Sequence, residues 1–112
     1  VLDREVLGVT QRIGKKGSHV NNVSQGGRMV KVDDQNVIEG LSNISLKVFD
    51  YFDLKMCGID VIFDKNDQTF KFLEVNSVPG WKGFQNATKI DVAGKIIDFC
   101  IKKAEEGNNQ NK

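Results

Sequence analysis

Three side chains with oxygen ligands lie on two neighbouring apolar runs of the chain. Glu74 and Asn76 stand two residues apart in the run 72–80, and Asp60 lies upstream in the run 58–63. A carboxylate in an apolar strand needs a partner or a cation, because an unpaired buried charge is costly. Two acids with oxygen-only ligands suit Mg²⁺ or Mn²⁺, which complete their shells with water and substrate phosphates. These residue types therefore indicate a divalent-metal site.

The two runs are predicted to form a β-hairpin. Residues 58–64 and 69–76 have strand character, and the polar residues 65–68 between them are turn-forming. If the turn is centred near Asp67, Asp60 lies opposite Glu74 on the paired strand, and such cross-strand neighbours come within about 5.5 Å of each other. Facing carboxylates repel one another unless they are protonated or bridged by a cation. The predicted pairing therefore favours metal binding.

Strand alternation predicts the faces of this hairpin. Side chains two positions apart point the same way. Glu74 and Asn76 are therefore expected on one face together with Phe70 and Phe72. On this basis Asp60, Glu74 and Asn76 converge at one end of the sheet.

The same residues also have an explanation without a metal. An acid at a strand edge is usually solvated, and an asparagine before Ser-x-Pro, as at Asn76, usually belongs to a turn. A calcium loop of the EF-hand type does not fit, because Thr69 and Val75 stand where that loop needs a glycine and a bidentate acid. His19 is the only histidine, and we expect it to be a surface strand residue rather than a general base.

The spacing of apolar residues and the positions of turn-forming residues predict the helices and strands that must position these ligands. Apolar residues recur every three or four positions over 35–54 and over 91–104, which predicts two amphipathic helices, with caps at Asp33 or Asp34 and at Asp91. The other expected elements are strands at 5–13, 19–23 and 29–32, a turn at 14–17, a loop at 77–89 and a disordered tail at 105–112. The expected fold is α+β, an antiparallel β-sheet with two main helices packed on it.

Composition limits the classes of function. The 112 residues carry a formal net charge of +1, so we expect one small domain, or part of a larger protein, with no basic face for nucleic acid. No apolar run approaches the ~20 residues that span a membrane, and the first residues do not form a signal peptide. Cys57 and Cys100 lack metal-type spacing. We expect both to be buried, reduced thiols, which favours a cytoplasmic protein.

Four blocks of the sequence together resemble the ATP-grasp superfamily, most closely its RimK-like carboxylate–amine ligases, which include glutamate ligases. The blocks are residues 21–27, 58–60, 72–80 and 87–94. The resemblance extends over about residues 5–101. It implies that residues 1–104 form a C-terminal ATP-grasp subdomain, a fragment of a larger enzyme.

The resemblance implies a role for each residue that matches a family motif. Asp60, Glu74 and Asn76 correspond to the Mg²⁺ ligands, which hold two ions of Mg²⁺ or Mn²⁺. Arg12 resembles a basic residue that faces the phosphates, with an exposed strand arginine as the equal alternative. Arg12 and Asn22 are the candidates for a catalytic role. The implied ATP-binding residues are Val20, Asn21, Asn22, Gly26 and Gly27, although the family usually has a polar residue near Val20.

In this family ATP phosphorylates a substrate carboxylate, and an amine then attacks the acylphosphate. The resemblance implies that the chain is the C-terminal part of an ATP- and Mg²⁺-dependent ligase for a carboxylate and an amino-acid-like amine. We expect it to be inactive without the family's N-terminal and central subdomains. Neither a membrane nor a nucleic acid is an expected partner, and a homo-oligomer is left open. Two alternatives stand: a non-catalytic ATP-grasp-like module that binds a nucleotide or a protein, and a plain α+β interaction domain.

Overall fold

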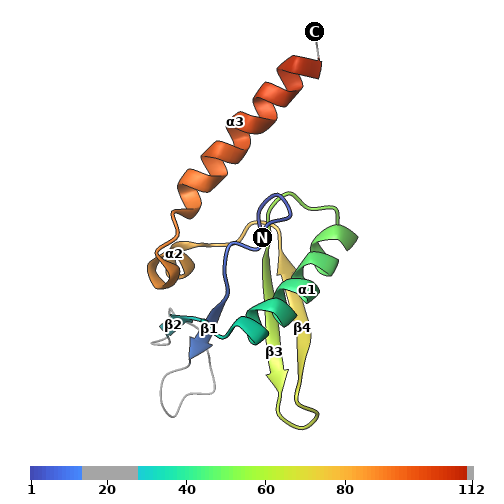
Figure 1. The fold of residues 1–112 in the computed structure, drawn as a ribbon, viewed down its shortest axis with the longest axis vertical. Coiled ribbons are helices and arrows are strands. Elements are labelled where there is room, and N and C mark those ends of the chain that lie inside the picture. The colour runs from blue at the N-terminus through green and yellow to red at the C-terminus, as the bar shows by residue number, and fades with distance from the viewer. Residues whose placement is uncertain (14–27, 111–112) are drawn as a thin grey trace.

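The computed structural model describes residues 1–13 and 28–110 of the chain (Figure 1). Its elements are β1 (Thr10–Ile13), β2 (Arg28–Lys31), α1 (Gln35–Tyr51), β3 (Gly58–Asp64), β4 (Thr69–Asn76), α2 (Lys82–Thr88) and α3 (Val92–Gln110). β1 pairs with β2, and β3 pairs with β4, both antiparallel. The α+β class with antiparallel strands is confirmed. Within the described residues, the strands form two separate pairs rather than one sheet.

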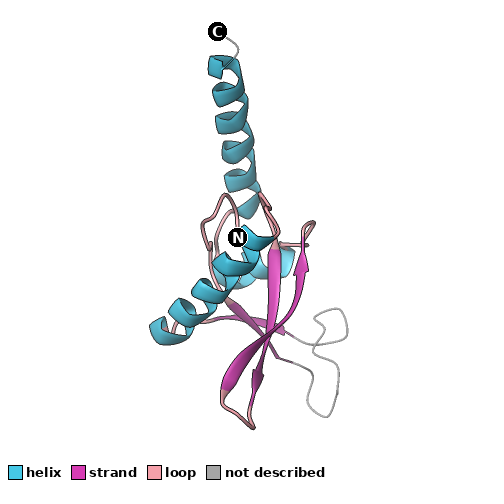
Figure 2. Ribbon diagram, turned by 90° about the vertical axis from the view of Figure 1, so that its right-hand side faces the viewer, coloured by secondary structure: helices cyan, strands magenta, loops and turns pink. Residues whose placement is uncertain are grey.

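The helix α1 packs against the β3–β4 hairpin, as both views of the ribbon show (Figures 1 and 2). Its predicted cap is confirmed, because the side chain of Asp34 accepts hydrogen bonds from the first turn of the helix. Leu41 and Phe49 are buried on its inner face. The helix ends at Tyr51, short of the predicted residue 54, and Asp53 then adopts a positive φ of 51° that breaks the helical path.

The β3–β4 hairpin has the bounds that the sequence predicts. Its polar turn is held by local hydrogen bonds, in which Asp64 accepts from the Asn66 amide at 2.9 Å and Asp67 accepts from the Thr69 amide at 3.2 Å. Lys71 reaches back to Asp67 with an ion pair of 2.7 Å. The turn therefore sets the register in which the first residue pairs of the hairpin meet.

A β-bulge interrupts this hairpin halfway along. Val61 pairs with Phe72, but Asp60, the preceding residue of β3, pairs with Glu74. Leu73 is therefore the extra residue, and it has no partner on β3. Without the bulge, the register set by the turn would bring Asp60 opposite Leu73. The extra residue thus moves the acid of β3 into line with the acid of β4.

The C-terminal half differs from the prediction at two places. The segment expected as a loop over 77–89 contains the helix α2, and the structure corrects that expectation. The helix α3 extends beyond residue 104 to Gln110 and so includes most of the predicted tail. It projects away from the strands along most of its length (Figure 1). Neither α3 nor the other helices in the described part of the chain are long and apolar enough to cross a membrane.

Smaller corrections concern the first strand and the thiols. β1 begins at Thr10 rather than residue 5, because the residues before it form only isolated bridges. Of the two cysteines expected to be buried, Cys57 is buried but Cys100 is exposed on the projecting helix α3. Both thiols are free, as predicted.

Candidate functional site

The hairpin brings the three predicted metal ligands to one face at one end. Asp60 lies directly opposite Glu74, and Gly58 lies opposite Asn76. Partners in an antiparallel pair share a face, and residues two apart on one strand do so too. Asp60, Glu74 and Asn76 are thus on the same face, as predicted, with the facing Cβ atoms roughly 5 Å apart.

The prediction that Phe70 and Phe72 share a face with these ligands is wrong, because the bulge reverses the alternation of side chains along β4. Phe72 pairs with Val61 and Phe70 pairs with Phe63, and both partners lie an odd number of residues from Asp60. Phe70 and Phe72 therefore occupy the opposite face from Glu74. One face of the hairpin is consequently apolar, whereas the other carries the oxygen ligands.

Arg12 provides the cation that contacts this acid pair. It lies on β1, in the other sheet, and its Nη1 atom is 3.1 Å from Oδ1 of Asp60. The side chains are 49% and 30% exposed, respectively, so the ion pair is partly open to water. The sequence left Arg12 equally balanced between a phosphate-facing residue and an exposed strand arginine. Its contact with Asp60 puts Arg12 beside the acid pair.

Asn76 has a structural task as well. Its Oδ1 atom accepts a hydrogen bond from the Val78 amide at 3.0 Å, which is the turn chemistry that sequence reasoning offered as the alternative to metal binding. A carboxamide oxygen has two lone pairs, so this bond leaves one for a cation. The turn also brings Pro79 onto Gly58, where an added Cβ would lie 3.0 Å from the proline ring. Gly58 thus allows the loop after β4 to close over the strand end.

The donor set fits Mg²⁺ or Mn²⁺ better than a soft metal. Within residues 1–13 and 28–110, no three His, Cys, Asp or Glu side chains gather closely enough to hold a metal by themselves. Mg²⁺ does not need such a cluster, because it usually binds one or two carboxylates and completes its shell with water and phosphate oxygens. Two opposed acids and a carboxamide on an accessible face meet this requirement.

The predicted ATP-binding residues fall outside the described part of the chain. These residues are Val20, Asn21, Asn22, Gly26 and Gly27. His19 lies in the same segment. Their assignments rest on the sequence resemblance alone.

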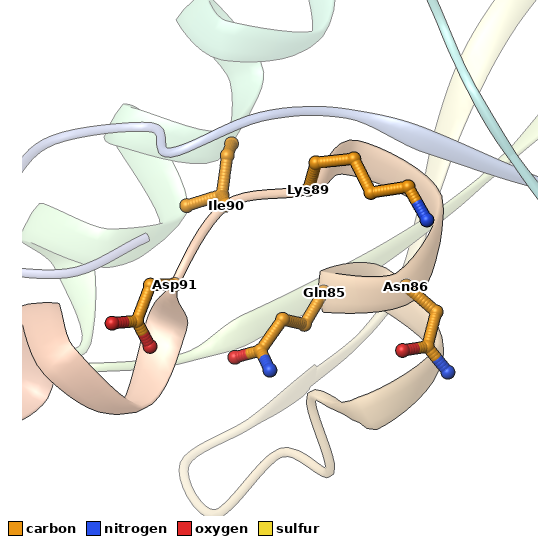
Figure 3. A pocket seen from close by; sticks show the side chains of 5 residues that line it. All are labelled: Gln85, Asn86, Lys89, Ile90 and Asp91. Carbon is orange, nitrogen blue, oxygen red and sulfur yellow. The ribbon is translucent and has the colours of Figure 1, made fainter.

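The motif at 87–94 joins α2 to α3 and lines a shallow hollow of about 300 Å³ (Figure 3). Lys89 and Asn86 point to one side of the hollow, whereas Asp91 points away from them. Gln85 accepts a hydrogen bond from the Val92 amide at 3.0 Å. Asp91 accepts one from the Gly94 amide, also at 3.0 Å, and this confirms the predicted cap of α3. These side chains hold the helix junction together rather than converge on one point.

Comparison with known proteins matches nearly the whole chain. The model of the RimK-like ATP-grasp domain matches residues 1–100. The tetrahydromethanopterin:α-L-glutamate ligase of Methanocaldococcus jannaschii is 35% identical over 101 residues, which cover 90% of this chain and 33% of the relative. Probable α-L-glutamate ligases of Legionella pneumophila and Maridesulfovibrio salexigens are 34% and 31% identical, over 94% and 100% of this chain and 33% and 36% of their own lengths. The chain spans about a third of the length of these curated relatives.

Proposed function

Because the chain belongs to the RimK-like ATP-grasp family, we propose that it is the C-terminal part of an ATP- and divalent-metal-dependent carboxylate–amine ligase. Residues 1–104 would form the subdomain that carries the metal ligands. The N-terminal and central subdomains would complete the nucleotide site. The observation that carries the proposal is the cross-strand pair of Asp60 and Glu74 with Arg12 beside it.

The proposed metal ligands differ in charge and therefore in role. Glu74, with two oxygens, would bridge two ions, Asp60 would hold one of them, and Asn76 would add a neutral ligand that leaves the net charge unchanged. Bound Mg²⁺ or Mn²⁺ would offset the negative charge on the transferring phosphoryl group. The acids would keep the ions in place, and their exposed position would leave room for phosphate oxygens and water.

The proposed substrates are a carboxylate and an amino-acid-like amine, which would be joined as an amide. The names of the relatives support glutamate as the amine. The acylphosphate would form by attack of the carboxylate on the γ-phosphorus with release of ADP, and the amine would then displace inorganic phosphate. The guanidinium of Arg12 would stabilise the anionic phosphate by its charge, and the Asn22 side-chain amide and the Gly26–Gly27 backbone amides, which the resemblance assigns to this region, would donate hydrogen bonds to it.

A test of this proposal uses the full-length protein that carries the chain, supplied with ATP, Mg²⁺, glutamate and a panel of carboxylates. We expect carboxylate-dependent release of phosphate, and hydroxylamine should trap the acylphosphate as a hydroxamate. Asp60→Asn and Glu74→Gln should each lower turnover by at least 100-fold. Asp64→Asn is the matched control, since Asp64 lies on the same strand and face as Asp60 but its carboxylate serves the turn.

Equal activity in all three variants would refute the proposed site. ATP binding without any turnover would instead favour the non-catalytic nucleotide-binding module. We expect no turnover from residues 1–112 alone, because the proposed reaction needs the other subdomains. A cytoplasmic location is also proposed, on the basis of the two free thiols.

A further inference from the structure

We propose that Arg12 is an exchangeable counter-ion of Asp60, which a divalent cation displaces when it binds to the acid pair. This inference rests on the proposed function, since it takes Asp60 and Glu74 as cation ligands. The observation behind it is the contact of 3.1 Å between Arg12 Nη1 and Asp60 Oδ1, which links the β1–β2 pair of strands to the β3–β4 hairpin.

The contact has the features of a pair that exchanges readily. Arg12 is about half exposed and Asp60 about a third exposed, and ion pairs in contact with water shift an equilibrium by only about 1.5-fold to 5-fold. A divalent cation carries twice the charge of a guanidinium and binds oxygens of both facing acids at once. It therefore has the advantage over Arg12 at this carboxylate.

Arg12 and the cation cannot share the Asp60 oxygen without cost. The carboxylate has lone pairs for both, but two positive centres at one carboxylate repel each other. A guanidinium does not lose its proton in proteins, so Arg12 cannot adapt by becoming neutral. The repulsion is relieved when Arg12 moves away from Asp60.

The exchange would couple two binding events in the ligase. A displaced guanidinium remains on β1 beside the cation, where its planar donors suit the oxygens of a phosphate. Cation binding would thus release an anion-binding group next to the site that holds the phosphates of ATP. Before the cation binds, the same group would offset part of the repulsion between Asp60 and Glu74.

The experiment is a titration of the 112-residue chain with Mn²⁺, in which electron paramagnetic resonance measures the free ion at low ionic strength. Arg12→Gln should bind Mn²⁺ roughly twofold to fivefold more tightly than the wild type. The matched control is Arg4→Gln, which removes the same charge from an arginine that also pairs with an acid, Asp50, at 2.8 Å. The Mn²⁺ affinity of this control should stay within about 1.5-fold of the wild-type value.

Equal affinity in the wild type and in Arg12→Gln, or weaker affinity in that variant, overturns the inference and leaves the metal site standing. Absence of saturable Mn²⁺ binding from both proteins overturns the metal site and the inference together. A second measurement does not depend on a variant at Arg12. The NMR signal of the Arg12 guanidinium should shift when Mg²⁺ is added to the wild type and should stay still in Asp60→Asn, and an unmoved wild-type signal contradicts the exchange.

Discussion

Deleting Leu73 should leave the acid pair intact, because this residue is the unpaired member of the bulge. Its side chain is 60% exposed. After the deletion the register set by the turn runs unbroken, with Phe72 still opposite Val61 and Glu74 still opposite Asp60. Since little apolar area is lost, we expect the free energy of unfolding to fall by no more than about 1 kcal/mol. The melting temperature should then fall by no more than roughly 4–8 °C.

A matched insertion should have the opposite outcome. One serine inserted between Asp60 and Val61 also removes the bulge, since it supplies Leu73 with a partner. Strand alternation then turns Asp60 and Glu74 to the apolar face of the hairpin. That face is only partly covered, because Phe72 on it is 41% exposed, so moving the two carboxylates there costs roughly 2–3 kcal/mol each. The apolar neighbours that turn outward lose part of roughly 1.5–3 kcal/mol each. This total is comparable to the whole stability of a small domain, about 5–15 kcal/mol, so the insertion should leave the chain largely unfolded at 25 °C.

Circular dichroism during heating, together with urea titration, distinguishes the two variants. Side-chain alternation across the bulge predicts that the deletion variant folds and still binds Mn²⁺, whereas the insertion variant shows no cooperative unfolding transition. If the deletion destabilised the chain as much as the insertion, the local twist that the bulge introduces would itself be required for stability. The assignment of faces by counting residues across Leu73 would then be refuted.

Two further predictions concern the packing and the thiols. Phe49 is only 6% exposed, so Phe49→Ala should lower the free energy of unfolding by about 3–5 kcal/mol in urea titration. Tyr51 is 83% exposed, and Tyr51→Ala should change the same free energy by less than about 0.5 kcal/mol. Equal effects would show that α1 is packed differently. Burial raises the pKa of the Cys57 thiol, so at pH 8 a thiol reagent should modify the exposed Cys100 quickly and Cys57 only when the chain opens. A rapid reaction that persists in Cys100→Ser would contradict the buried position of Cys57.

Sequence reasoning found the hairpin and its acid pair because the signals were local. Two apolar runs flank a polar turn, and both strands have the predicted bounds. The bulge has no such signal, since Leu73 is as apolar as its neighbours and looks like an ordinary strand residue. The pairing of Asp60 with Glu74 was predicted correctly, whereas the register between the turn and the bulge was off by one residue and the face of Phe70 and Phe72 was wrong.

The helices were harder to predict where composition was ambiguous. The segment 77–89 holds a proline and two glycines, which favour a loop, and α2 is only 7 residues long. Beyond residue 104 the apolar period stops, yet Glu105 and Glu106 are good helix formers, and α3 continues through them. The contact of Arg12 with Asp60 joins residues far apart in the sequence, so neither spacing nor periodicity could predict it.

The central claim is that Asp60, Glu74 and Asn76 hold a divalent cation. The most direct test is a titration of the isotope-labelled chain with Mn²⁺ in NMR, because the paramagnetic ion broadens the signals of nearby nuclei. We predict that the signals of these three residues disappear first, while those of Asp64 and Asp91 persist. Broadening that spreads evenly over all the acidic residues would contradict the claim.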